Sequence, residues 1–262
     1  MKAQLCLGQL YEKGLGVAQS DVEAERWFVM AAQQGDLEAQ HNLAVFNKFK
    51  RGVAPSDVEA VRWWTLAANK GYAIAQSCLG NMYADGRGVA KSDVEAMNWF
   101  RKGAEQGNVG AQYNLGFFYH NGRGVPQNDA EAAKWYRKAA CQGHAMVQTN
   151  LSYFYSSGRG MAQNDKEAAQ WMLKAAEQGL VQAQCKTGSN YMSGSGVAQN
   201  FEEAAKWLQK GGEQGDEWAQ CRLGLLYLQG HGVTKSTEVA TRWLRMAAAQ
   251  GDPEAKKVLK LL

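Results

Sequence analysis

Glycine pairs of the form Gly-x-Gly recur along the chain and are the pattern most easily mistaken for a nucleotide-binding loop. Such a loop needs a third glycine after a β-strand to bind a dinucleotide, or a Gly-Lys-Ser/Thr ending to bind a phosphate. Neither feature accompanies the pairs that begin at Gly86, Gly122 and Gly158. Because glycine tolerates the positive φ of a tight turn, their repetition indicates turns between helices and no bound nucleotide cofactor.

Histidine and cysteine are the other residues that could do chemistry, by binding a metal ion or acting as nucleophiles. The four histidines show neither His-Glu-x-x-His spacing nor a shared helix face: His41, His120, His144 and His231. The five cysteines are Cys6, Cys78, Cys141, Cys185 and Cys221. They form no Cys-x-x-Cys pair, and most of them are expected at small apolar positions that are buried or half-buried. Cys185 and Cys221 hold equivalent positions in neighbouring repeats, where stacked helices lie about 8–10 Å apart, beyond disulfide reach. The sequence therefore predicts a protein that is not an enzyme and uses no metal or cofactor.

The composition narrows the class of protein further. Of 262 residues, 45% are apolar, which is enough for a substantial core, and 29 basic side chains nearly balance 25 acidic ones. A net charge of +4 spread along the chain argues against nucleic acid as a partner, since that calls for a clustered basic face. No apolar run reaches the roughly 18 residues of a membrane-spanning helix, so no membrane insertion is expected.

A 36-residue period runs through the whole sequence and is clearest in its tryptophans: Trp27, Trp63, Trp99, Trp135, Trp171, Trp207 and Trp243. Internal periods of this length are typical of repeat proteins, in which each unit buries its apolar face against the next. We predict a single solenoid of seven repeats and a partial eighth: 3–38, 39–74, 75–110, 111–146, 147–182, 183–218, 219–254 and 255–262.

Each repeat reads as two helices joined by a glycine turn. In the fourth repeat, Ala111, Leu115, Gly116 and Tyr119 recur at helical spacing and form the apolar stripe of a first helix. The turn follows at residues 122–125. Small residues such as Gly116 would let the two helices of a repeat approach closely.

The second helix of each repeat begins with a capping-box pattern, in which Ser or Asn precedes Glu by three residues. The pattern occurs at Ser20/Glu23, Ser56/Glu59, Ser92/Glu95, Asn128/Glu131, Asn164/Glu167 and Asn200/Glu203. In the fourth repeat the buried stripe of this helix is predicted to be Ala132, Trp135, Ala139 and Ala140, with Gly143 ending it at C′. We expect the tryptophan to fill the space towards the neighbouring repeats, and basic residues such as Lys102, Lys138, Lys174 and Lys210 to lie on a solvated face.

The complete pattern, A-x-x-x-L-G-x-x-Y-x-x-G-x-G-V followed by A-x-x-W and A-A-x-x-G, resembles the Sel1-like repeat, a relative of the tetratricopeptide repeat. This resemblance covers essentially the whole chain and implies an all-α fold, a right-handed α/α superhelical solenoid of helix-turn-helix repeats. Two repeats depart from the pattern. The second has Ala44, Asn47 and Lys50 in place of glycine, tyrosine and glycine, and the sixth has Thr187 for leucine and Phe201 for an acidic residue.

The resemblance also implies where a partner would bind, because first helices line the concave groove of tetratricopeptide-like solenoids. Groove positions carry charge near the N-terminal end and become aromatic, apolar and neutral from the fourth repeat onward. The groove candidates of the predicted site are His41, Val45, Phe49, Tyr113, Phe117, His120, Tyr153, Met192, Trp218, Leu225 and Leu228. Asparagines before the Leu-Gly leucine are candidates to hydrogen-bond a ligand backbone: Asn42, Asn114 and Asn150. The alternative reading is that rings such as Phe117 and Tyr153 pack against neighbouring first helices.

Arginines stand at the turn edge of three successive repeats: Arg87, Arg123 and Arg159. They predict either solvated loops or a basic ridge that meets an acidic partner or a phosphate backbone.

Two functions fit these observations. The first is a bacterial scaffold or adaptor that binds a protein or peptide in the groove, which by resemblance includes immunity and host-interaction proteins. The second is a structural component that docks by its ends, including as an end-to-end homodimer, through apolar residues such as Val258, Leu259, Leu261 and Leu262. Unpaired cysteines and the lack of a signal peptide favour the cytoplasm, while a processed or truncated chain would be periplasmic or secreted.

Overall fold

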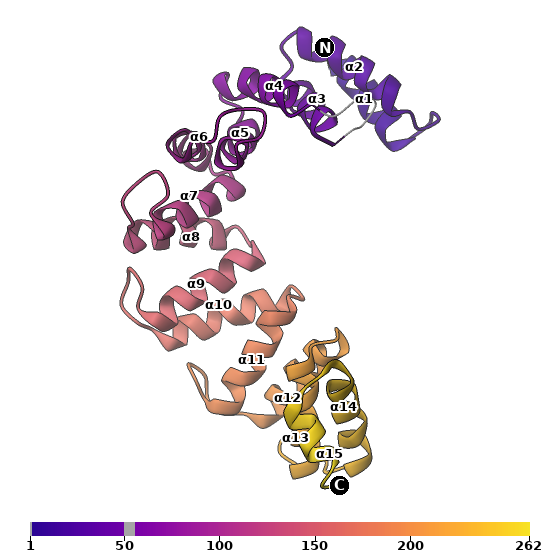
Figure 1. Cartoon of the computed structure of the whole chain (residues 1–262), viewed down its shortest axis with the longest axis vertical. Coiled ribbons are helices and arrows are strands. Elements are labelled where there is room, and N and C mark those ends of the chain that lie inside the picture. The colour runs from indigo at the N-terminus through magenta and orange to yellow at the C-terminus, as the bar shows by residue number, and fades with distance from the viewer. Residues whose placement is uncertain (1, 50–55) are drawn as a thin grey trace. The chain divides into compact units, whose positions relative to one another are not determined.

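A computed structural model of the protein describes residues 2–49 and 56–262, and every regular element in those ranges is an α-helix (Figure 1). The chain forms two compact units, Met1–Lys138 and Ala139–Leu262. In each unit, consecutive helices pack in pairs, with an odd-numbered first helix against the even-numbered second helix that follows it. The predicted turn at Lys50 and Gly52 lies outside the described residues.

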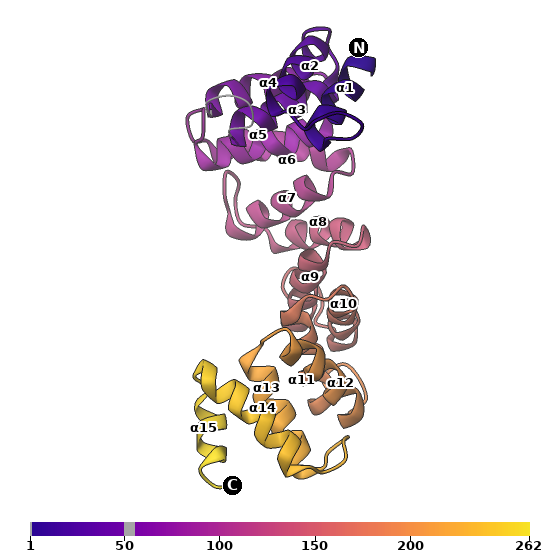
Figure 2. The same ribbon diagram turned by 90° about the vertical axis from the view of Figure 1, so that its right-hand side faces the viewer.

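The helices of the first unit are α1 (Lys2–Lys13), α2 (Asp21–Gln33), α3 (Leu37–Phe49), α4 (Asp57–Asn69), α5 (Ala73–Asp85), α6 (Asp93–Glu105), α7 (Val109–Asn121) and most of α8 (Asp129–Cys141). The second unit contains α9 (Ala145–Ser157), α10 (Asp165–Glu177), α11 (Val181–Ser193), α12 (Phe201–Glu213), α13 (Glu217–Gln229), α14 (Thr237–Gln250) and α15 (Pro253–Leu259). Within this unit the short α15 packs against α14 (Figure 2).

The second helices begin where the capping boxes predicted. The Ser92 hydroxyl accepts a hydrogen bond of 3.2 Å from the backbone N–H of Glu95, and the Asn164 side chain accepts one of 3.0 Å from Glu167. Each such cap satisfies a backbone donor that the helix itself leaves free, which is typically worth about 1 kcal/mol.

The buried stripe of α8 differs from the prediction by one residue. Tyr136 is 2% exposed and Trp135 is half-buried, so the core position is the one after the tryptophan. It faces the glycine of the first helix: a Cβ placed on Gly116 would lie 2.8 Å from the Tyr136 ring, and one on Gly80 would lie 2.6 Å from the Phe100 ring. The glycine therefore makes room for the large side chain that follows the tryptophan.

The tryptophans reach towards the preceding repeat, as the sequence predicted. Trp99 packs against a cluster that includes Ala67 and Ala68, and Trp135 against one that includes Ala104. A lysine three residues on covers the outer face of several of these rings, with its ammonium 4.1 Å from the Trp99 centroid and 4.0–4.2 Å from the others: Lys102, Lys138, Lys174 and Lys210. These lysines, predicted as a solvated face, also make cation–π contacts, each worth about 0.5–1 kcal/mol at an exposed site.

A glutamine in most of the first helices joins successive repeats. The Gln76 amide donates to the backbone carbonyl of Ala68 at 3.1 Å, and its oxygen accepts from Gln106 at 2.7 Å. The same pair of bonds occurs around Gln148. This role was not predicted from the sequence, although the glutamine recurs at the repeat period.

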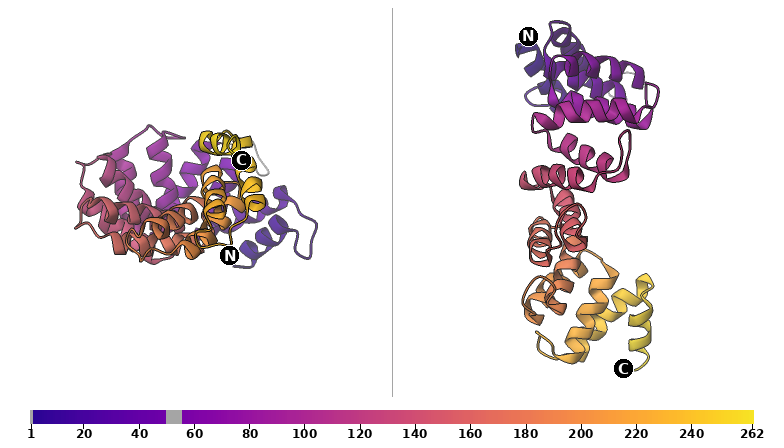
Figure 3. Two further views of the ribbon diagram at one scale, coloured as in Figure 1. Left: turned by 90° about the horizontal axis from the view of Figure 1, so that it is seen from below. Right: turned by 90° about the vertical axis from the view of Figure 1, so that its left-hand side faces the viewer.

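The second glycine of several turns is required by a close approach between repeats. Gly88 has a φ of 69°, and a Cβ there would overlap the backbone carbonyl of Asp57 in the preceding second helix. Gly196 stands in the same relation to Asp165. The Gly-x-Gly pattern thus joins one helix pair to the next, which explains its repetition. Figure 3 shows these turns at the ends of the helix pairs.

Candidate functional site

The first helices of the first unit carry an aromatic group on α7. Tyr113 and Phe117 lie one helical turn apart with ring centroids separated by 6.5 Å, and Tyr113 lies 5.9 Å from the buried Tyr136 ring. Burial and the neighbouring Tyr113 raise the pKa of Tyr136 well above its usual value, so it stays neutral. Phe117 keeps 36% of its surface exposed. These aromatic side chains therefore contact the core through Tyr136 and are exposed to solvent at Phe117.

The polar candidates of this unit have partners within the chain. The Asn114 amide donates to the Asn81 side chain at 2.9 Å, which joins α7 to α5. His120 Nδ1 lies 2.6 Å from the Asp129 carboxylate. A ligand that used Asn114 as a clamp would have to compete with Asn81.

Of the predicted groove residues on α3, some pack towards the core and one is exposed to solvent. His41 is half-buried, and its Nδ1 accepts a hydrogen bond of 3.1 Å from Trp64. Burial lowers the pKa of His41. Val45 packs against the core and Asn42 is half-buried. In contrast, Phe49 is 62% exposed, and the Lys48 ammonium lies 5.2 Å from the centroid of its ring.

In the second unit, Tyr153 on α9 is the most exposed of the predicted aromatic candidates there, at 49%. The hydroxyls of Ser156 and Ser157 donate to its backbone carbonyl at 3.1 and 2.7 Å. These serines, which occupy predicted groove positions, are thereby satisfied by their own helix. Asn150 on the same helix is half-buried.

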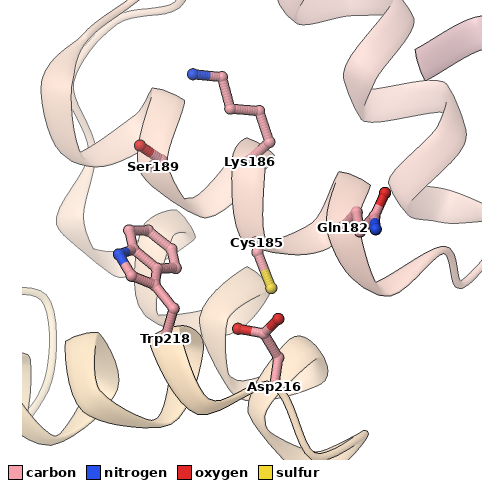
Figure 4. Close-up of a pocket in the computed structure, with 6 residues that line it drawn as sticks. All are labelled: Gln182, Cys185, Lys186, Ser189, Asp216 and Trp218. Carbon is pink, nitrogen blue, oxygen red and sulfur yellow. The ribbon is translucent and has the colours of Figure 1, made fainter. Parts of the chain in front are cut away.

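A cavity of about 310 Å³ lies between α11 and α13 (Figure 4). The Trp218 indole forms one side and the Cys185 sulfur points at the Asp216 carboxylate, while Lys186 extends away from them. Burial, with the adjacent Asp216, raises the pKa of Cys185 to about 12, so the thiol is protonated at neutral pH. A protonated thiol is a poor nucleophile and metal ligand. Asp216, which caps α13 by accepting from the Ala219 N–H at 2.8 Å, was not among the predicted site residues.

The remaining apolar candidates lie against the core of the second unit. Met192 is half-buried in the same cluster as Trp218. Leu225 and Leu228 pack, half-buried, on a cluster that includes Ala255 of α15. The partial eighth repeat therefore covers part of the predicted groove of the seventh.

Two of the three turn arginines, Arg87 and Arg123, form ion pairs with the preceding repeat, whereas Arg159 is exposed. Arg87 binds both carboxylate oxygens of Asp57 at 3.0 Å. Arg123 pairs with Asp93 and lies 4.4 Å from the centroid of Phe118. These pairs were not predicted from the sequence, because each joins residues 30 positions apart.

Most of the cysteines are buried or half-buried, as expected. Cys185 and Cys221 are buried and Cys78 is half-buried, but Cys6 and Cys141 are exposed, and all five are free thiols. Among the described residues, no group of three or more His, Cys, Asp or Glu side chains could hold a metal ion. No helix in the same part of the chain is long and apolar enough to cross a membrane.

Comparison with known proteins follows the repeat pattern. The Sel1 repeat family matches residues 2–36, 37–72, 73–108, 109–144, 145–180, 181–216 and 219–252, up to two residues before the predicted boundaries. None of the curated proteins matches the chain.

Two solved structures are similar over nearly the whole chain. One is a protective antigen present in uropathogenic Escherichia coli strains that displays an SLR fold, with a TM-score of 0.93, 37% identity, and coverage of 97% of this chain and 54% of that one. The other is a Sel1 repeat protein from Oxalobacter formigenes, with a TM-score of 0.78, 34% identity, and coverage of 99% and 75%. This chain thus spans about half the length of the antigen. The protein belongs to the Sel1 repeat family, whose helical repeats generally serve as protein-interaction scaffolds and are typically non-catalytic.

Proposed function

We propose that the protein is a non-catalytic scaffold that holds a segment of a partner protein against the first-helix faces of its repeats. The observation that carries this proposal is the exposure of large aromatic side chains there. Phe117 is 36% exposed and Tyr153 is 49% exposed. Aromatic side chains that the fold leaves exposed are candidate contact points for a partner, because aromatic anchors dominate the binding energies of interfaces.

The test is affinity capture from a lysate of the source organism, comparing the wild type with the double variant Phe117→Ala/Tyr153→Ala. Leu66→Ala/Met246→Ala is the matched control, because these side chains are 42% and 47% exposed but lie on the second helices α4 and α14. Loss of an anchor costs about 2 kcal/mol or more, so capture should fail for the first variant and persist for the control. Equal capture by all three proteins would contradict the proposal. A large drop in melting temperature of the first variant would mean that its rings belong to the core.

Self-association is the second candidate function, and exposed leucines favour it. Leu261 is 79% exposed and Leu262 is 59% exposed. Deleting the last eight residues would also remove the buried Ala255 of α15. Replacing only these two leucines by serine is therefore the milder test. A concentration-dependent dimer that disappears in this variant would support self-association, and a strict monomer at high concentration would exclude it.

A further inference from the structure

The sixth repeat lacks the arginine that joins other repeats. Arg87 pairs with Asp57 and Arg123 with Asp93, but the position one period after Arg159 is Ser195. The acidic partner is still present as Asp165, the first residue of α10, and it is exposed. It accepts a hydrogen bond of 3.4 Å from its neighbour Gln163, which is at the long end of the range for such bonds.

A cavity of about 50 Å³ occupies the place that the arginine side chain fills in the fourth repeat. There, Arg123 pairs with Asp93, donates to the backbone carbonyl of Ala84 at 3.4 Å and stacks on Phe118. The positions 72 residues later than Ala84, Asp93, Phe118 and Arg123 all line this cavity: Ser156, Asp165, Asn190 and Ser195.

Of the residues that line the cavity, Tyr153 favours the binding of a cation and Lys186 opposes it. Tyr153, exposed on the first-helix face, lines the cavity and offers a ring face for a cation–π contact. Lys186, also a lining residue, is the one group there that would repel a cation, and asparagine holds its place in the fourth repeat as Asn114. The cavity is thus continuous with the surface proposed to bind a partner.

We propose that this cavity takes an arginine side chain from the partner segment, with its guanidinium paired to Asp165 as Arg123 pairs with Asp93. This inference rests on the proposed function and specifies that one residue of the partner segment is an arginine. Arginine fits better than lysine because its planar fork can bind a carboxylate and a backbone carbonyl together, as Arg123 does.

The direct test titrates the full-length protein with Nα-acetyl-arginine amide and follows the amide signals of Ser156 and Ser195 by NMR. The neutral isostere Nα-acetyl-citrulline amide is the ligand control. We expect saturable shifts with a millimolar Kd for the arginine compound. Citrulline, or the variant Asp165→Asn, should weaken binding on the order of tenfold, since a charge-assisted hydrogen bond is lost. Lys186→Asn should strengthen it.

The variant Ser195→Arg supplies the missing side chain from within the chain. It should abolish binding of the arginine compound and raise the melting temperature, because it restores the ion pair seen in the third and fourth repeats. Absence of shifts, or equal binding of both compounds to the wild type and Asp165→Asn, would overturn the inference. Phe117→Ala should leave arginine binding intact, so failure of partner capture and failure of the arginine site are separate results.

Discussion

Thr187 occupies a position that leucine fills in the other repeats, and the substitution leaves two defects in the core. The residue is 3% exposed, its hydroxyl has no hydrogen-bond partner, and it borders a cavity of about 40 Å³ beside Leu173 and Tyr191. An unpaired buried hydroxyl and an unfilled cavity each cost stability. We therefore expect that one substitution in the sixth repeat can increase the stability of the protein.

We predict that Thr187→Leu raises the free energy of unfolding by about 1–2 kcal/mol, because it fills the cavity and removes the unpaired hydroxyl. Denaturant unfolding of the full chain measures the change. Thr187→Val, which removes the hydroxyl but adds less volume, should give a smaller gain. A loss of stability in both variants would show that the hydroxyl has a partner.

His41 gives the first unit a pH dependence. Its Nδ1 accepts from Trp64, so this nitrogen must be unprotonated, and burial lowers its pKa. The unfolded chain, with an ordinary histidine pKa of about 6.5, therefore binds the proton more readily. The contribution of His41 to stability is full above that pH and is lost as the pH falls below it towards the folded pKa.

We expect the stability advantage of the wild type over His41→Gln to shrink between about pH 8 and about pH 5. Denaturant unfolding at both pH values, with an NMR titration of His41 for its pKa, provides the measurement. A constant advantage, together with a pKa at the ordinary value, would contradict the assignment.

At the scale of the helices, the turn glycines hold successive pairs together. Gly88 and Gly107 both have a positive φ, of 69° and 88°. They differ in surroundings: a Cβ on Gly88 would overlap the backbone of Asp57, whereas one on Gly107 meets nothing within 4 Å. Substituting each glycine in turn therefore distinguishes the stability cost of the close approach from the cost of the backbone conformation.

Gly107→Ala should cost about 1–2 kcal/mol for the left-handed conformation alone. Gly88→Ala should cost clearly more, because α4 must also move away from the turn. Thermal unfolding of the two variants makes the comparison. Equal losses would mean that the repeats do not depend on this contact.

Local signals in the sequence predicted the helices well, and contacts between helices less well. Capping residues such as Ser92 act on their own helix, so their pattern is enough to predict where it begins. The positions three and four residues after Ala132 lie on the same helix face, so the helical period does not decide between Trp135 and Tyr136 for the core. Pairs such as Arg87 and Asp57 depend on how one repeat stacks on the next, and no local pattern encodes that.

For the molecule as a whole, the repeat period was sufficient to predict the fold, but it carries no information about the partner. Structural residues recur every 36 positions, and residues free of that constraint differ from repeat to repeat. The second group includes Phe117 and Tyr153, whose exposure the sequence could not establish. It also includes Ser195, whose difference from Arg123 has meaning only once the ion pair is seen.

The most direct test of partner binding on the first-helix faces is site-specific photo-crosslinking in cells of the source organism. A photoreactive phenylalanine analogue would replace Phe117 or Tyr153, and in control strains Leu66 or Met246 on the second helices. Our account predicts that the first two positions crosslink to the same partner protein and the control positions do not. Crosslinks from Leu66 and Met246, with none from Phe117 or Tyr153, would contradict it.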